Sequence, residues 1–268
     1  MDLNKIYVGD TLETLRTFPD DCIDIVVTSP PYNKGGAQGG LVKEVNYQAS
    51  SDIQDENKYQ ANQIDVLNEL YRVVKPKGHV FYNHKVRWVD GVMIHPLEWL
   101  FATKWLGKLR QEIVWDRGIA GQLRGWRFWQ VEERIYWMQK GIMRGEELLS
   151  KHAKLTSIWR IRPEQIHKEH PAPFPLDIPT RCIYSVADKQ EGLTVLDPYC
   201  GIGTTLVAAR FLKHNYVGID CSDEYAKIAE DRMINNHSEW EKSLIALEMT
   251  NHWVKTTYQE RKQKKKKV

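Results

Sequence analysis

The sequence predicts an α/β fold in which helices cover both faces of a doubly wound, mostly parallel sheet. Short apolar runs alternate with helical patterns along the 268 residues, as in strand–helix–strand connections. The run Ile25-Val26-Val27-Thr28 shows no polar alternation, which is typical of a strand buried on both faces. Residues 193–233 form a compact βαβα pattern. The length and a hydrophobic content of 42% suit one large domain, or one domain with a small insertion.

Strands and helices also alternate in the first third of the chain. We expect strands at Ile6–Val8, Ile23–Thr28 and His79–Asn83 and helices at Thr11–Phe18 and from Ala61 to Val74. The second helix has apolar residues on one face and should stop at Pro76 and Gly78. Residues 34–60 hold four glycines and little periodicity, so they are predicted to form a long binding loop or lid.

The remaining elements are predicted in the same way. Glu98–Leu106 has a helical pattern, and Gln111–Trp115 and Glu132–Met138 have extended ones. Residues 141–169 lack clean periodicity, and the proline-rich HPAPFPLDIP opens a helix near Ile178–Ser185. The βαβα pattern divides into strand Leu193–Leu196, loop Asp197–Gly203, helix Thr204–Leu212, strand Tyr216–Ile219 and helix Ser222–Met233.

Composition narrows the class of protein. No apolar run reaches the roughly 18 residues that span a bilayer, and MDLNKIYVGD lacks a leader pattern, so we expect a cytoplasmic protein with no membrane partner. The four cysteines are scattered, as for buried thiols in a reducing compartment, and we expect no metal site. The net charge is +3, but residues 259–268 carry six basic residues and one acidic residue. That tail could bind a polyanion or only aid solubility.

The stretch VLDPYCGIGTTLVAARFLKHNYVGID has the features of a nucleotide-binding unit. Gly201 and Gly203 allow a tight turn before a helix N-terminus, and Asp220 ends the next strand, where a carboxylate can accept both ribose hydroxyls. NAD is one candidate ligand, but Leu206 stands where its fingerprint has a third glycine. Asp197 would repel a pyrophosphate and attract an ammonium group, which favours S-adenosylmethionine over NAD.

A second motif follows the buried strand. In TSPPYN, the two prolines end the strand in a stiff bend that carries a hydroxyl, carbonyls and an aromatic ring. In a doubly wound sheet this bend can face a ligand held by the glycine loop, because both lie at the carboxyl ends of strands. Alone, Ser-Pro-Pro-Tyr would be interpreted as an ordinary turn.

Together the motifs resemble those of the DNA amino-methyltransferases. TSPPYN is similar to their catalytic motif and LDPYCGIGTT to their methionine-binding loop, and LNELYRVVKPKGHVFYNH and KEHPAPFPLDIPTRCI resemble further segments. With the catalytic motif first, the order is that of the β group, and the likeness covers most of residues 4–233. It implies the Rossmann-like sheet of the S-adenosylmethionine methyltransferases, circularly ordered with the catalytic half first.

The resemblance divides the chain into four parts. Residues 1–116 would form the catalytic half, 117–167 a short target-recognition insertion, 168–240 the cofactor-binding half, and 241–268 a C-terminal extension with the basic tail.

The bend suits methylation of an exocyclic amine. Such an amine is a poor nucleophile, because its lone pair is delocalised into the ring. It also cannot be reached inside a duplex, so the base must be flipped out. Ser29 and the Pro30 carbonyl can accept the two amine hydrogens, Pro31 stiffens the bend, and Tyr32 can stack on the base.

The resemblance also implies further site residues. The cofactor contacts would be Asp10 at the adenine, Phe174 along the pocket, Asp197 at the amine, Gly201 and Gly203 in the loop, Thr204 or Thr205 at the carboxylate, and Asp220 at the ribose. The DNA contacts would be Asn33, Lys34, Trp115, Arg117, Arg124 and Arg127. Asp10 could instead cap a helix, Trp115 could pack in the core, and any single arginine could belong to a solvated face.

The target base is the least determined feature. Adenine-N6 enzymes of this family most often carry Asp where this chain has Ser29, and cytosine-N4 enzymes most often Ser, so cytosine N4 is favoured with adenine N6 as the alternative. Cytosine C5 is disfavoured, because no cysteine lies in a Pro-Cys loop. RNA or protein amide methylation and an inactive DNA-binding subunit stay open. Double-stranded DNA is the expected partner, and a homodimer and a cognate restriction endonuclease are further candidates.

Overall fold

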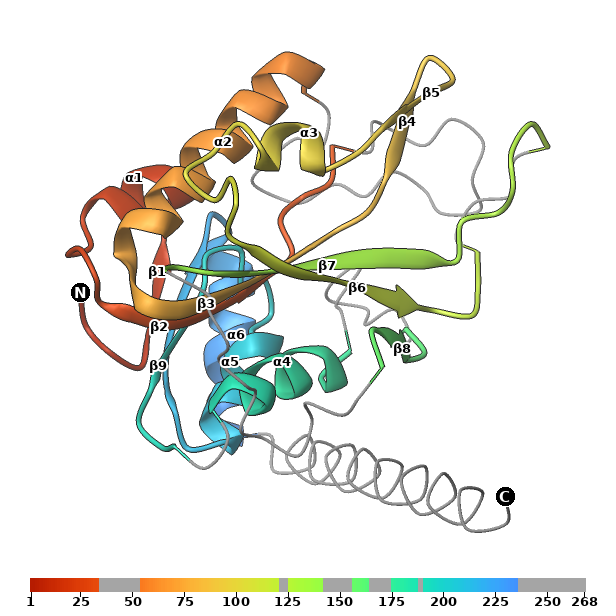
Figure 1. The fold of residues 1–268 in the computed structure, drawn as a ribbon. Helices are drawn as coiled ribbons and strands as arrows, with labels where there is room; N and C mark the ends of the chain where they lie inside the picture. The colour runs from red at the N-terminus through yellow and green to blue at the C-terminus, as the bar shows by residue number, and fades with distance from the viewer. Residues whose placement is uncertain (34–53, 121–124, 142–155, 164–174, 188–189, 236–268) are drawn as a thin grey trace, which may run out of the picture.

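The computed structural model describes residues 1–33, 54–120, 125–141, 156–163, 175–187 and 190–235. Within them, eight strands form one mixed sheet in the order β1-β10-β9-β2-β3-β7-β6-β8, and β4 and β5 form a separate hairpin (Figure 1). The prediction of a doubly wound, mostly parallel sheet is confirmed. The basic tail and most of the loop 34–60 lie outside the described residues.

The elements have the following bounds. The strands are β1 Lys5–Val8, β2 Ile23–Thr28, β3 Val74–His84, β4 Arg87–Val89, β5 Val92–Ile94, β6 Leu109–Asp116, β7 Glu132–Gln139, β8 Ile158–Arg160, β9 Thr194–Asp197 and β10 Asn215–Asp220. The helices are α1 Thr11–Arg16, α2 Glu56–Val73, α3 Leu97–Leu100, α4 Asp177–Ala187, α5 Thr204–Phe211 and α6 Asp223–Asn235. No helix among the described residues is long and apolar enough to cross a membrane.

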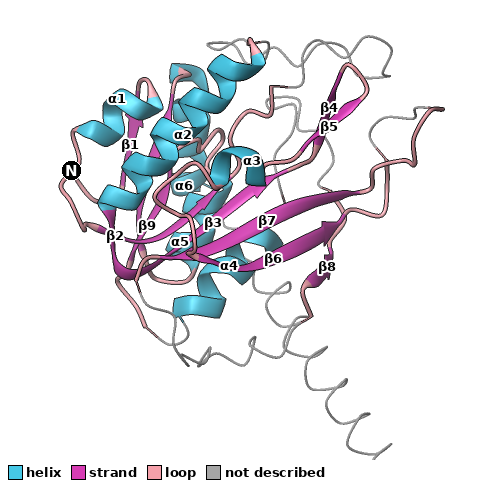
Figure 2. Cartoon of the chain, turned by 45° about the horizontal axis from the view of Figure 1, so that its top comes forward, coloured by secondary structure: helices cyan, strands magenta, loops and turns pink. Residues whose placement is uncertain are grey.

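Helices lie on both faces of the sheet. Helices α1, α2 and α3 cover one face and α4, α5 and α6 the other (Figures 1 and 2). Each face has its own apolar core, with Leu67 and Trp99 in the first and Ile183 and Leu206 in the second. Strands β2 and β9 contribute side chains to both cores, which explains their continuous apolar runs.

The direction of the chain reverses between β9 and β2, which are parallel neighbours in the middle of the sheet. From β9 the chain passes through α5 to β10 on one side, and from β2 through α2 to β3 on the other. The carboxyl ends of β9 and β2 therefore meet at a topological switch point, where doubly wound folds bind their ligands.

Several element boundaries differ from those predicted. Helix α2 begins five residues before Ala61, because the side chain of Asp55 caps it by accepting the Lys58 N–H. Strand β3 begins at Val74 and passes through Pro76, because a register shift opposite Ile23 and Ile25 accommodates the proline. The helix expected at Glu98–Leu106 is only the single turn of α3, and β4, β5 and β8 were not predicted.

Candidate active site

The two sequence motifs meet at the switch point. Asp197 ends β9, and Ser29 directly follows β2. The Thr205 hydroxyl, at the start of α5, donates a 2.7 Å hydrogen bond to Asp197 Oδ2 and lies 3.3 Å from the Val27 carbonyl oxygen. Thr205 thus joins the glycine loop to the strand that carries the bend.

The glycine loop needs glycine at Gly203. Its φ is +80°, a left-handed conformation that other residues rarely adopt. A Cβ atom added there would lie 2.9 Å from Ala229 Cβ on α6. The loop therefore packs closely against α6, and the first N–H groups of α5 lie directly after it.

Asp197 is a buried carboxylate with an unusual protonation equilibrium. It is 1% exposed, and its hydrogen-bond donors are the Thr205 hydroxyl and, at 3.1 Å, the Tyr199 N–H. Burial raises its pKa from the ordinary 3.8 to about 6, although these hydrogen bonds act in the opposite direction. A bound ammonium group would place a positive charge beside this carboxylate.

Asp220 holds two loops together at the end of β10. Its carboxylate accepts the N–H groups of Gly201 and Ser222, each at 2.8 Å, and burial raises its pKa. The adjacent strand β1 leads to Asp10, which caps α1 by accepting the Glu13 N–H at 3.0 Å. Asp10 is therefore a helix cap in the structure, which is the alternative that the sequence left open for it.

The polar groups around the glycine loop fit S-adenosylmethionine. The carboxylates of Asp197, Asp220 and Asp10 follow the neighbouring strands β9, β10 and β1, an arrangement that suits an ammonium group and ribose hydroxyls and opposes a pyrophosphate. The N–H groups that open α5 suit the carboxylate of an amino acid.

The Ser-Pro-Pro-Tyr bend ends in a polar cluster. The Ser29 and Tyr32 hydroxyls lie 2.7 Å apart, and the Tyr32 hydroxyl donates to Glu133 Oε2 at 2.9 Å. Asn83 Nδ2 lies 2.8 Å from the Tyr32 hydroxyl and 3.3 Å from Ser29 Oγ. The Tyr32 ring is 7% exposed and packs on His84, with ring centroids 4.6 Å apart.

Glu133 reaches this cluster because β7 runs antiparallel to β3. The amino-terminal end of β7 therefore lies at the carboxyl edge of the parallel strands, beside the bend. Glu133 is 5% exposed, and its Oε1 pairs with Arg117 Nη1 at 3.0 Å.

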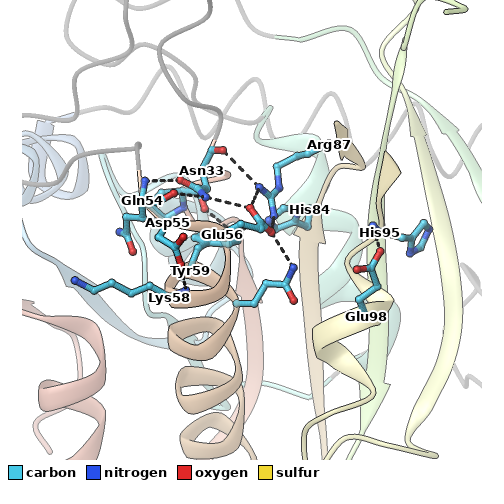
Figure 3. Close-up of polar contacts among 12 residues, drawn as sticks. Asn33, Gln54, Asp55, Glu56, Lys58, Tyr59, His84, Arg87, His95 and Glu98 are labelled. Carbon is cyan, nitrogen blue, oxygen red and sulfur yellow. Dashed lines mark hydrogen bonds and ion pairs between the residues drawn. The ribbon is translucent and has the colours of Figure 1, made fainter. Parts of the chain in front are cut away.

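A second polar cluster follows the bend (Figure 3). The Asn33 side chain is joined to Gln54 by two hydrogen bonds, from the Gln54 N–H at 2.7 Å and to the Gln54 carbonyl at 3.1 Å. Arg87 donates to both oxygens of Glu56 at 2.7 Å. Tyr59, on α2, donates to the Pro31 carbonyl at 2.8 Å, so α2 supports the bend directly.

Comparison with known proteins agrees with this geometry. A family model described as DNA methylase, of the N6/N4 type, matches residues 23–231. The chain belongs to the DNA methylase family. It is 28% identical over 261 residues to the type II methyltransferase M.BglII of Bacillus subtilis, covering 85% of this chain and 68% of the relative. It is 26% identical to M.HpaI of Haemophilus parainfluenzae, with 85% and 74% covered.

Solved structures share the fold of this methylase. The PvuII DNA methyltransferase, which is cytosine-N4-specific, aligns with a TM-score of 0.69 at 18% identity over 95% of this chain and 94% of its own. TTHA0409 of Thermus thermophilus, a candidate DNA modification methylase, aligns with a TM-score of 0.62 at 25% identity over 87% and 96%. The protein is thus a DNA methyltransferase of the N4/N6 amino-methyltransferase family.

The structure places the other predicted site residues of the methylase as follows. Trp115 lies in the core, 3% exposed, with its indole N–H donating to the Ile161 carbonyl, so the core alternative describes its position. Thr204 is buried, with its hydroxyl 3.3 Å from Arg232 Nη1. The Arg127 guanidinium stacks on Trp88, 3.8 Å from the ring centroid. Lys34, Arg124 and Phe174 lie outside the described residues.

Sequence reasoning missed Asn83, Glu133 and Arg87. Asn83 ends a predicted strand, at the edge where functional groups are expected, and that position was the available signal. Glu133 begins a strand, and only the antiparallel pairing of β7 brings it to the site.

Proposed function

We propose that this DNA methylase transfers the methyl group of S-adenosylmethionine to the N4 amine of a flipped-out cytosine. The observation that carries the proposal is the Ser29 hydroxyl, which follows β2 beside the loop of Asp197. A neutral hydroxyl stands where a carboxylate is typical of adenine-N6 enzymes. Adenine N6 is the alternative.

The cofactor would be held by residues of the three loops that follow β9, β10 and β1. Asp197 would bind its ammonium group, the N-terminus of α5 its carboxylate, Asp220 its ribose and Asp10 its adenine. When bound, S-adenosylmethionine supplies an electrophilic methyl group on a sulfonium. Thr205 keeps the Asp197 carboxylate aligned with the strand that leads to Ser29.

The bend would act by orientation and electrostatics. Ser29 Oγ and the Pro30 carbonyl would accept the two amine hydrogens and direct the nitrogen lone pair at the methyl group. Tyr59 fixes the bend through the Pro31 carbonyl.

Methylation of cytosine C5 would require a thiolate that adds to C6 of the ring. Burial raises the pKa of the Cys200 thiol well above its ordinary value, and Cys22 precedes β2, at the opposite edge of the sheet from Ser29. Neither Cys200 nor Cys22 therefore offers a thiolate beside Ser29, which favours an amine as the target.

Double-stranded DNA would approach the end of the sheet from which residues 125–131 and the β4–β5 hairpin extend (Figures 1 and 2). Trp126, Phe128 and Trp129 are exposed there, with Phe128 at 99%, and we call these three residues the aromatic surface. The Arg127 guanidinium lies over the Trp88 ring and 5.7 Å from the centroid of Trp126. Aromatic and guanidinium planes are groups that stack on unpaired bases.

The segment that carries the aromatic surface is tied at its C-terminal end to the polar cluster of Ser29, Tyr32 and Glu133. The Arg117 N–H donates to the Val131 carbonyl at 2.9 Å, and Arg117 also pairs with Glu133. A base leaving the duplex at the aromatic surface would therefore enter beside Ser29. A homodimer, a cognate restriction endonuclease and a cytoplasmic location are further parts of the proposal.

The test is methyl transfer from labelled S-adenosylmethionine to unmethylated genomic DNA, followed by nucleoside mass spectrometry. N4-methylcytosine is the expected product, and N6-methyladenine would establish the alternative. The Asp197→Asn variant, which should not bind the cofactor, is the control for contaminating activity. Label absent from DNA, with cofactor binding measured by calorimetry, would overturn the proposal and direct attention to RNA or protein amides.

A further inference from the structure

We infer that Glu133 is a positioning residue that fixes Ser29 as a hydrogen-bond acceptor for the target amine. The inference rests on the proposed function and explains how a serine can act only as a hydrogen-bond acceptor toward the amine, as a carboxylate does. It follows from counting hydrogens along the chain of contacts from Glu133 through Tyr32 to Ser29.

Tyr32 has one hydroxyl hydrogen, and an ionised carboxylate can only accept. The contact of 2.9 Å with Glu133 Oε2 therefore uses the Tyr32 hydrogen. The contact of 2.7 Å between Tyr32 and Ser29 then requires the Ser29 hydrogen. Ser29 Oγ is left with lone pairs only, and it can meet an amine hydrogen but cannot donate one.

Asn83 favours the same direction of hydrogen bonding, from Ser29 to Tyr32 to Glu133. Its side-chain nitrogen lies within 3.3 Å of Ser29 Oγ, the Tyr32 hydroxyl and Glu133 Oε2. The amide presents its nitrogen here, because its oxygen would lie 3.2 Å from a carboxylate oxygen that has no hydrogen to give. Asn83 thus gives hydrogens to the cluster and accepts none from it, so the Ser29 hydrogen has Tyr32 as its acceptor.

Arg117 pairs with Glu133 on the side of the carboxylate away from Tyr32. The carboxylate is 5% exposed, and the guanidinium binds Oε1, the oxygen that Tyr32 does not use. Without this carboxylate, the hydroxyl hydrogens of Tyr32 and Ser29 could take the reverse direction, and the Ser29 hydrogen would then point toward the amine. Glu133 therefore determines that Ser29 donates to Tyr32 and Tyr32 donates to Glu133, and it does so from the side opposite to the base.

The experiment is a double-mutant cycle on single-turnover methylation with Glu133→Gln and Tyr32→Phe. If Glu133 acts through the Tyr32 hydroxyl, each change lowers the methyl-transfer rate by on the order of tenfold, and the double variant is no slower than the slower single variant. S-adenosylhomocysteine affinity by calorimetry and DNA affinity by fluorescence anisotropy should stay within about twofold. Glu132→Gln, at the neighbouring and more exposed carboxylate, is the matched control and should keep the wild-type rate.

A rescue separates this role from a structural one. Ser29→Asp supplies an acceptor that does not depend on its neighbours. Adding Glu133→Gln to this variant should therefore leave its methyl-transfer rate unchanged. Additive losses in the cycle, or a wild-type rate for Glu133→Gln, would overturn the inference. If Glu133→Gln does not fold, Tyr32→Phe keeps the Glu133–Arg117 pair, and a wild-type rate for it has the same meaning. A wild-type protein that methylates no DNA amine would instead overturn the proposed function.

Discussion

Asp197 Oδ2 accepts a 2.7 Å hydrogen bond from the Thr205 hydroxyl at the point where β9 and β2 of the methylase lie side by side. The carboxylate is buried, and its pKa is raised by burial to about 6. Folding thus holds an anion in a place that disfavours it, as expected where a cationic ligand completes the site.

Replacing Asp197 with Asn should separate stability from binding. The amide keeps the shape of the side chain and removes the buried charge, so the free protein should gain up to about 3 kcal/mol at neutral pH, from the shift of about two pKa units. Cofactor binding should be lost, because the ammonium group has no counter-charge. Thermal unfolding and calorimetry measure the two effects, and normal affinity in this variant would exclude Asp197 as the ammonium ligand.

The affinity of the wild-type protein for S-adenosylhomocysteine should depend on pH. Below about pH 6 the free protein holds a protonated Asp197, which cannot attract an ammonium group, so affinity should rise as the pH increases through about 6. Stability should change in the opposite direction. The folded-state pKa lies above that of the unfolded chain, so the native state takes up the proton first and is favoured as the pH falls toward 3.8. Calorimetry and melting curves at several pH values test both, and a flat affinity profile would contradict the prediction.

The Glu56–Arg87 pair should be essential for stability. Arg87 is buried and stacks over the Tyr59 ring at 4.8 Å, so Arg87→Met should cost about 3 kcal/mol by leaving a partly buried carboxylate unpaired. Adding Glu56→Gln should recover part of this loss. Burial raises the Glu56 pKa, but the hydrogen bonds from Arg87, Gln60 and Asn33 and the charge of Arg87 together outweigh it and lower the pKa. The contribution of the pair should therefore be full above about pH 4.5 and decline as the pH falls. Urea unfolding measures each variant, and a double variant less stable than Arg87→Met would refute this account.

The aromatic surface should contribute to DNA binding. Phe128→Ala removes a fully exposed ring, and we expect a loss of about 1–3 kcal/mol of DNA affinity with no loss of thermal stability. Phe101→Ala, at an exposed aromatic residue at the end of α3, is the control. Anisotropy titration of a labelled duplex measures both, and equal effects of the two variants would show that the aromatic surface has no special role.

Much of the site was predictable because its residues follow strands that the sequence marks clearly. Ile23–Thr28 and the βαβα unit are continuous apolar runs with sharp ends, and parallel strands place their carboxyl ends at one edge. Ser29, Asp197 and Asp220 could therefore be assigned to one site before the structure was known. The bounds of β3 could not, because a register shift against β2 carries the strand through Pro76.

The sequence by itself determined the fold class, the family and the residues of the two motifs, because these depend on local order and on the pattern of apolar residues. Only the tertiary structure decided that Glu133 and Arg117 lie beside Ser29 and Tyr32. The physical reason is the antiparallel direction of β7, which brings the beginning of one strand to the ends of the others. Strand direction depends on pairing between distant segments, and no local pattern in the chain records it.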